Sequence, residues 1–474
     1  MDKKNLIFIM CDQMTGKVLD ENSDYIIPAL RSLENDSVNI RRAYAPNPIC
    51  SPSRASLMTG TLPHTHGMVD VTHAVPSYRA EYNYNLDNFS LILKESGYST
   101  SYYGKWHVER KHCLEKFGYD EWVTEREMSA PHYTALSKTI VSNPGTGYPD
   151  KAIGGVYEEG ADASDEHFLF SKAIDFIERK KDGPFFTFIS TNAPHDPYTV
   201  PKEFYDMYQD LELPESFYDP MDDKPAIYKR IRSVFSGFTP EDYKTVRRYY
   251  HAYCTLIDSE IGRLVAYLKE KGLYDDTMIV FLSDHGDLQG AHGLICKGVP
   301  AFEEGYRIPL LFKLPGNRNN GLKTDDLFSV IDIAPTVLSE LGLSPLRNHI
   351  EGIDKSSSLD GDIHDYCVVA ENFGQRYAYT QRIIWKDNRK YVFNGFDYDE
   401  YYDLSRDPNE MVNRIDDLEC QDDVKEMCSE LQRIVLETKD TTLGDAVYFM
   451  HRFLPVGPKK EAGTAEFKIY NKEF

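Results

Sequence analysis

Three short segments of this sequence have the composition of strands buried inside a parallel sheet: residues 6–10, 184–190 and 277–283. A continuous apolar run, without the alternation of a half-exposed strand, is typical of a strand that is covered on both faces. Further strands are predicted over residues 98–103 and 309–314, and a long helix over the period that runs from Val246 to Leu268. This succession predicts an α/β fold with a large mixed, mostly parallel sheet flanked by helices.

Residues that can take part in chemistry follow four of these predicted strands. They are Asp12, the pair Lys105 and His107, His195, and the pair Asp284 and His285. The carboxyl ends of parallel strands gather along one edge of a sheet, which is where ligands bind in open α/β folds. A carboxylate next to an imidazole also suits a divalent metal ion. The four coincidences together predict one site at this edge.

A separate stretch, residues 50–60, combines a cysteine with groups that bind anions. It reads Cys-Ser-Pro-Ser-Arg-Ala-Ser-Leu-Met-Thr-Gly. Cys50 opens a helix-forming run, so free backbone N–H groups and the Arg54 guanidinium converge near its thiol. A buried structural thiol is the plain alternative. A thiol phosphatase loop has a longer spacing between cysteine and arginine, and a cysteine hydrolase needs a histidine partner. The stretch therefore predicts a nucleophile in an oxyanion site.

This stretch resembles the signature of type I sulfatases, Cys-x-Pro-Ser-Arg followed by Ala-Ser-Leu-x-Thr-Gly. The resemblance extends from Asn5 to about Asn413, and it includes Gly-Lys-Trp-His at residues 104–107 and Ser-Asp-His-Gly at residues 283–286. It implies the alkaline phosphatase-like fold and the hydrolysis of sulfate monoesters, in a sulfated sugar or another small organic sulfate.

The resemblance also implies the catalytic groups. In the family, a maturation enzyme oxidises the cysteine to Cα-formylglycine, whose hydrated aldehyde is the nucleophile, and here that residue is Cys50. Arg54, Lys105 and Lys297 would neutralise the sulfate. His107 would face the formylglycine hydroxyl, and either His195 or Lys297 would protonate the leaving alcohol.

One divalent metal ion is expected, held by Asp12, Cys50, Asp284 and His285, with Gln13 supplying an oxygen in place of a carboxylate that family members often have. Family members often carry Asp-Asp at the first strand end, whereas this chain has Cys11 before Asp12. Calcium is the ion that the family favours. Because one carboxylate is missing and an imidazole is present, magnesium, manganese and zinc stay open.

Two other functions stay open at this point. Phosphonate monoester and phosphodiester hydrolases of the same superfamily also resemble this chain in its Asp-Gln pair after the first strand and its Asp-His metal pair. The presence of Lys105 and His107 favours a sulfate substrate over these alternatives. A binder of sulfated glycans that lacks the modification and has no turnover is the hypothesis from a different class.

Composition limits the partners of this protein. A formal net charge of −23 argues against nucleic acid, and no segment has the run of about 18 apolar residues that spans a membrane. The eight cysteines contain no Cys-x-x-Cys pair, which favours reduced thiols. The N-terminus lacks a signal sequence, which predicts a cytoplasmic protein. The oligomeric state is left open.

Two predictions concern organisation. Residues 1–370 are expected to form the catalytic domain. Residues 371–474 are expected to form a smaller α+β subdomain, with a hairpin around Asp387-Asn388 and a helix that includes Val424 and Leu431. Residues 108–182 are polar and glycine-containing, and they predict loop or lid material with a helix only near residues 168–179.

Overall fold

The computed structural model describes residues 3–73, 75–128, 134, 137–141, 151–375, 377, 379–395 and 397–444. Within this part of the chain, one sheet has nine strands, in the order β10-β2-β11-β9-β1-β7-β3-β4, with β12 paired to β2. Their bounds are β1 (Asn5–Cys11), β2 (Val38–Tyr44), β3 (Ser99–Gly104), β4 (Glu121–Thr124), β7 (Phe185–Ser190), β9 (Thr277–Ser283), β10 (Arg307–Ile308), β11 (Leu310–Lys313) and β12 (Lys323–Ser329).

The centre of this sheet is parallel. β1 pairs in parallel with β9 and β7, and β3 pairs in parallel with β7 and β4. In the register of these strands, Ile9 of β1 pairs with Phe281 of β9 on one side and with Ile189 of β7 on the other. β11 and β10 run antiparallel to their neighbours. The mixed, mostly parallel sheet and the five predicted strands are therefore confirmed, and the carboxyl ends of β9, β1, β7 and β3 lie side by side.

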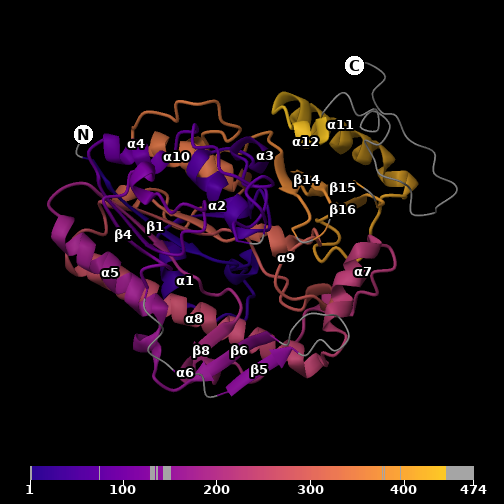
Figure 1. The fold of residues 1–474 in the computed structure, drawn as a ribbon, viewed down its shortest axis with the longest axis horizontal. Helices are drawn as coiled ribbons and strands as arrows, with labels where there is room; N and C mark the ends of the chain where they lie inside the picture. Colours follow the sequence, from indigo (N-terminus) through magenta and orange to yellow (C-terminus); the bar gives the residue numbers. More distant parts are fainter. Residues whose placement is uncertain are drawn as a thin grey trace.

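Helices cover both faces of the sheet. They are α1 (Pro28–Asn35), α2 (Cys50–Thr59), α3 (Pro63–His66), α4 (Phe89–Glu95), α5 (Asp165–Lys180), α6 (Lys202–Tyr205), α7 (Ala226–Arg232), α8 (Pro240–Glu270), α9 (Glu303–Tyr306), α10 (Ile333–Glu340), α11 (Gln421–Glu437) and α12 (Thr441–Gly444). Figure 1 shows α2, α4 and α10 on one side of the sheet and α5 with α8 on the other.

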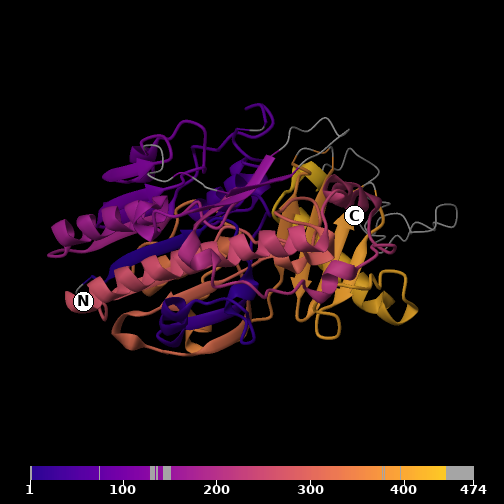
Figure 2. The same ribbon diagram turned by 90° about the horizontal axis from the view of Figure 1, so that it is seen from below.

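The two faces follow from alternation along β1. Leu6 and Phe8 pack in the hydrophobic cluster that contains residues of α2, α4 and α10, whereas Ile7 and Ile9 pack with residues of α1, α5 and α8. Successive side chains of a strand point to opposite faces, so a strand with a helical layer on each side must be apolar throughout. The long predicted helix is α8, and it begins at Pro240 after a Thr239–Asp242 capping box. Figure 2 shows α8 running across the molecule.

A second, antiparallel sheet lies at one end of the molecule (Figure 2). It contains β13 (Val368–Asn372), β14 (Gln381–Lys386), β15 (Arg389–Asn394) and β16 (Glu400–Asp403), and α11 packs on it. The predicted hairpin is β14–β15, in which Lys386 pairs with Arg389 and Asp387 adopts φ 50°, as a two-residue turn requires. The predicted boundary at residue 370 lies within β13. The division into two domains stays a prediction, and residues 445–474 lie outside the described residues.

The prediction that residues 108–182 are irregular is wrong for much of this segment. α5 confirms the expected helix, but β4 extends the large sheet. β5 (Ser137–Val141), β6 (Lys151–Tyr157) and β8 (Tyr198–Pro201) form a small separate sheet. A Cβ atom at Gly154 would lie 2.6 Å from the Tyr249 ring of α8, so glycine marks a close contact with that helix. The glycines at 145 and 147 lie outside the described residues.

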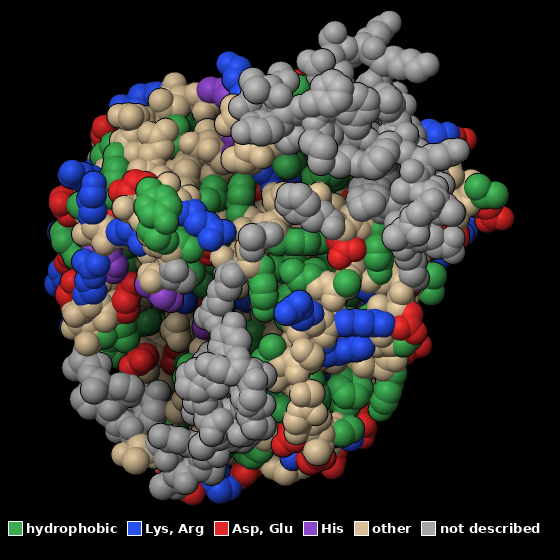
Figure 3. All heavy atoms as spheres, turned by 45° about the vertical axis from the view of Figure 1, so that its right-hand side comes forward, with side chains coloured by type: hydrophobic (Ala, Val, Ile, Leu, Met, Phe, Trp, Pro, Cys, Tyr) green, Lys and Arg blue, Asp and Glu red, His purple; other side chains and the backbone are tan. Residues whose placement is uncertain are grey.

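The described residues contain free thiols and a surface of mixed charge. None of their helices combines the length and the hydrophobicity needed to cross a lipid bilayer. All eight cysteines are free thiols. On the face drawn in Figure 3, acidic and basic side chains lie beside one another rather than in separate patches.

His64 links α3 to the C-terminal sheet through an ion pair. Its Nδ1 lies 2.5 Å from Glu371 Oε1, and its Nε2 lies 3.1 Å from the carbonyl oxygen of Thr438. Both ring nitrogens face acceptors, so the imidazolium form fits this position. Burial opposes the charge, but the Glu371 carboxylate outweighs it and raises the pKa of His64 to about 9.

Replacing His64 by asparagine should therefore make stability less dependent on pH. A histidine whose folded pKa lies above its unfolded value stabilises fully below about pH 6.5 and loses this effect as pH rises through 9. Urea unfolding should give a difference from wild type of about 3 kcal/mol at pH 6. This difference should shrink steadily toward pH 10.

His66→Asn is the matched control for this experiment. Burial lowers the pKa of His66 to about 3, so that ring is neutral in the folded protein, and its contribution should change by no more than about 1 kcal/mol between pH 6 and pH 10, in the direction opposite to that of His64. A His64→Asn difference that stays constant over this range would rule out the charged pair.

Candidate active site

The strand ends of the parallel core bring the predicted residues together around Asp12. Its carboxylate lies 2.6 Å from Lys105 Nζ, 3.7 Å from His285 Nε2, 3.9 Å from Lys297 Nζ and 4.0 Å from His195 Nε2. Gly104 permits the end of β3 to approach β7, because a Cβ atom there would overlap the carbonyl oxygen of Ser190. The single site that the sequence predicts at this edge of the sheet is confirmed as a cluster. The role of each residue stays a prediction.

Cys50 stands at the first position of α2 and points into this cluster. Its Sγ lies 3.2 Å from His285 Nε2, 3.6 Å from Asp12 Oδ1 and 3.8 Å from Lys105 Nζ. The residue is only 2% exposed. Burial favours the neutral thiol, but Lys105, Lys297 and His285 together hold the pKa of Cys50 well below its usual value. The position thus stabilises a negative atom at the end of the Cys50 side chain.

Arg54 is fully buried one turn further along α2, and it faces carboxylates. Its Nε donates to Asp284 Oδ2 at 2.7 Å, and its Nη2 donates to Asp12 Oδ2 at 3.0 Å. Its Nη1 donates to Ser190 Oγ and to the carbonyl oxygen of Lys105. Arg54 therefore holds the ends of four strands together, β1, β3, β7 and β9, and a direct contact with an anionic substrate stays a prediction.

Four buried residues form a candidate metal site: Asp12, Cys50, Asp284 and His285, whose ligand atoms all lie within 4.8 Å of one another. Burial and the neighbouring Asp12 carboxylate raise the pKa of Asp284, because two negative charges lie close together where water cannot solvate them. His285 Nδ1 lies 3.0 Å from the carbonyl oxygen of Gly286, so Nε2 is the nitrogen turned to the site. Two carboxylates and one oriented imidazole fit a divalent cation.

Gln13 follows Asp12 and adopts φ 73°. Its amide oxygen accepts a hydrogen bond from Lys297 Nζ at 2.5 Å, and its Nε2 donates to Asp287. The role of Gln13 as a metal ligand stays a prediction.

Sequence reasoning missed Asp287, which accepts hydrogen bonds from Gln13, from Tyr198 at 2.9 Å and from the backbone of Gln289 at 2.9 Å. The sequence feature that could have identified Asp287 is its position directly after Asp284-His285-Gly286.

Two histidines flank the cluster. His107 adopts φ 48°, and its Nε2 lies 3.1 Å from Nδ1 of His73, whose ring stacks on it. Burial lowers the pKa of His107, which keeps it neutral near pH 7. His195 turns Nδ1 toward the backbone oxygen of Asp196 and so directs Nε2 toward Asp12. His73 was not predicted, because no local pattern connects it to His107.

A cavity of about 710 Å³ opens beside these residues. Lys105 and His107 lie in its wall, together with Thr72, His73, Arg110, His112, Glu125, Arg126, Met128, Asp165, Leu169 and Asn192. A volume of this size is typical of a small-molecule site. The cavity therefore offers room for a small molecule next to the cluster around Asp12.

Known proteins resemble this chain over nearly its whole length. The sulfatase family model matches residues 4–343, and the model for the C-terminal region of N-sulphoglucosamine sulphohydrolase matches residues 290–437. An arylsulfatase of Clostridium perfringens is 29% identical over 469 residues, which cover 92% of this chain and 94% of that protein.

Solved structures share the fold. One, a complex of a protein with its substrate D-glucosamine-2-N,6-O-disulfate, has a TM-score of 0.72 at 21% identity and covers 93% of this chain and 99% of its own. A phosphonate monoester hydrolase of Silicibacter pomeroyi has a TM-score of 0.77 at 22% identity, over 93% of this chain and 97% of its own. The family model spans most of the chain and includes every residue of the catalytic cluster. The chain therefore belongs to the sulfatase family and is a sulfuric ester hydrolase.

Proposed function

We propose that this sulfatase hydrolyses the sulfate monoester of a small sulfated sugar or a similarly small organic sulfate, with Cys50 converted to formylglycine and one divalent metal ion bound. The observation that carries the proposal is the position of Cys50 Sγ, within 3.8 Å of Asp12, His285 and Lys105. The 710 Å³ cavity supports a small leaving group rather than a polymer threaded through the site.

Charge neutralisation is the main task of the side chains. A sulfate monoester is an anion, and a chain with a net charge of −23 repels it at long range. Lys105 reaches the cluster from the end of β3 and Lys297 from the segment between β9 and α9, and both lie within 4 Å of Asp12. We assign to these two lysines the binding and orientation of the sulfate oxygens.

The metal ion would be held by Asp12, Asp284 and His285, with Gln13 and the side chain at position 50 as further ligands. When bound, it supplies a Lewis acid that polarises an S–O bond and favours an ionised nucleophile. Calcium is proposed first, and magnesium, manganese and zinc are the alternatives that an imidazole ligand leaves open.

Formylglycine at position 50 would supply a hydrated aldehyde with two hydroxyl groups. His107 is assigned as the base, because its ring is neutral near pH 7 and stands next to Cys50. His195, with Nε2 turned toward the cluster, or Lys297 is assigned to protonate the leaving alcohol. Since Cys50 is buried, we expect the maturation enzyme to act on it before the chain folds.

The cytoplasmic location and the domain boundary at residue 370 also stay predictions.

The second candidate is phosphonate monoester or phosphodiester hydrolysis, which the structural likeness to the Silicibacter pomeroyi enzyme favours. Protein in which mass spectrometry shows formylglycine at position 50 should turn over an aryl sulfate with a kcat/KM at least about a hundredfold above that for a phosphonate monoester. Lys105 and His107 give the reason, because the sulfate proposal assigns both of them to the reacting group.

Lys105→Ala should lower kcat/KM for the aryl sulfate by about a hundredfold or more, whereas the exposed Lys111→Ala should leave it unchanged. A preference for the phosphonate would establish the second candidate. Binding of the aryl sulfate with Cys50 unmodified, and no turnover after co-expression with the maturation enzyme, would establish the non-catalytic binder.

A further inference from the structure

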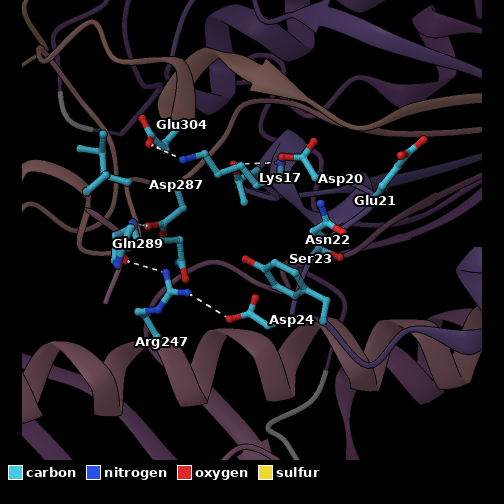
Figure 4. Close-up of a pocket in the computed structure, with 15 residues that line it drawn as sticks. Lys17, Asp20, Glu21, Asn22, Ser23, Asp24, Arg247, Asp287, Gln289 and Glu304 are labelled. Carbon is cyan, nitrogen blue, oxygen red and sulfur yellow. Dashed lines mark hydrogen bonds and ion pairs between the residues drawn. The ribbon is translucent and has the colours of Figure 1, made fainter. Parts of the chain in front are cut away.

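A second cavity, of about 460 Å³, lies apart from the one beside the catalytic cluster. The two share no lining residue among the described part of the chain. The second cavity is bounded by the segment that follows β1, the segment that follows β9, and α8. Figure 4 shows Gln289 and Asp287 on one side of it, Asp20 to Asp24 on the other, and Lys17 reaching across to Glu304.

Gln289 is the feature of this cavity that calls for a ligand. The residue is 4% exposed, and neither Oε1 nor Nε2 of its side chain has a hydrogen-bond partner in the described residues. Its backbone is held on both sides, because the N–H donates to Asp287 Oδ1 at 2.9 Å and the carbonyl oxygen accepts from Arg247 Nη1 at 3.2 Å. Burial of an unpaired donor or acceptor destabilises the folded chain, and a hydrogen-bonding ligand relieves that cost.

Arg247 adds a third unmet group. Its Nη2 lies 3.3 Å from Asp24 Oδ2, whereas its Nε is buried and has no partner in the described residues. Two donors and one acceptor are therefore buried in the walls of one cavity. A ligand that both donates and accepts hydrogen bonds would satisfy all three.

The charged groups around this cavity are already paired. Lys17 lies 2.6 Å from Glu304, Arg307 lies 2.9 Å from Asp20, and Lys323 lies 3.1 Å from Glu21. Asp24 is shared by Arg247 and His251. Asp287 already accepts bonds at both carboxylate oxygens. An anion would meet these carboxylates, and a cation would have to displace their partners, so the unmet groups select an uncharged molecule.

We propose that this cavity binds the hydroxyl groups of a neutral sugar or polyol, with Gln289 as the principal contact. A sugar hydroxyl donates to Oε1 while a neighbouring hydroxyl accepts from Nε2, and Arg247 Nε donates to a third oxygen. The volume holds about one or two sugar rings. Asp287 accepts a hydrogen bond from Gln13, whose amide oxygen accepts one from Lys297, so a chain of hydrogen bonds joins this cavity to the cluster around Asp12.

The test is direct binding of neutral probes to the full chain with Cys50 unmodified, so that its result is independent of any sulfatase turnover. D-galactose, D-glucose and glycerol should be titrated separately by saturation-transfer NMR, and we expect a dissociation constant in the millimolar range for at least one hexose. Excess inorganic sulfate, an occupant of the catalytic cluster, should not displace it.

Gln289→Met decides the assignment, because methionine keeps the size of the side chain and removes both unmet polar atoms. The variant should melt at or above the wild-type temperature, since it removes an uncompensated buried amide, and it should bind the hexose at least tenfold more weakly. Gln209→Ala, at an exposed glutamine, is the control and should bind like wild type. Absence of hexose binding, hexose binding that Gln289→Met leaves unchanged, or binding of sulfate or calcium that depends on Gln289 would each overturn the proposal.

Discussion

Cys50→Ala should lower aryl sulfate turnover by about ten-thousandfold or more, because it removes the side chain that we propose as the precursor of the nucleophile. Cys50→Ser should be comparably inactive. A serine offers one hydroxyl group, whereas a hydrated formylglycine offers two, and the second is needed to complete the cycle. Activity of Cys50→Ser close to wild type would contradict the formylglycine mechanism and indicate a simple nucleophile at position 50.

The same experiment includes a direct reading of the modification. Protein produced with the maturation enzyme should give a peptide containing residue 50 that is lighter by about 18 Da than the cysteine form, the change expected for formylglycine. Turnover should rise in proportion to the modified fraction. Cys113→Ala, at another free thiol, is the control and should keep both the mass change and the activity.

Arg54→Ala should lower the free energy of unfolding by about 3–5 kcal/mol, because it leaves buried charges without their partner. Asp12 and Asp284 both lose a guanidinium contact at 3.0 Å or less, and both are fully buried. Arg54→Lys keeps the charge but cannot reach both carboxylates with a planar fork, so we expect an intermediate loss. Urea unfolding in the presence of a chelator gives this comparison.

A divalent cation should compensate for part of this loss. The proposed ion would bind where Asp12 and Asp284 converge, so adding calcium, magnesium, manganese or zinc should stabilise Arg54→Ala more than wild type. The ion with the largest effect identifies the metal that the site prefers. Arg41→Ala is the control, since its pair with Asp325 is 45% and 57% exposed and should contribute less than about 1 kcal/mol. Equal losses for the two arginines would contradict the structural role of Arg54.

Most of the catalytic cluster could be predicted from residue patterns that are local in the chain. The apolar runs locate β1, β7 and β9 because a strand covered on both faces needs hydrophobic residues at every position. Once these strands are parallel, Asp12 and Asp284 must meet at one edge. The motif around Cys50 adds the residue that the strand argument does not reach. The same local logic failed for β6, since a strand that contains Gly154 and Gly155 has no continuous apolar run.

Hydrogen-bond partners could not be predicted in this way, because they depend on contacts between segments far apart in the chain. Arg54 was expected to contact an anionic substrate, which stays a prediction; that its donors meet Asp12 and Asp284, which follow β1 and β9, could not be predicted. His73 was missed for the same reason, whereas Asp287 had a local signal in its position directly after Asp284-His285-Gly286. The unpaired amide of Gln289 appears only when α8 and the segments after β1 and β9 enclose it. Hydrophobic pattern is a property of neighbouring residues, whereas register and packing decide which polar groups meet and which remain unmet.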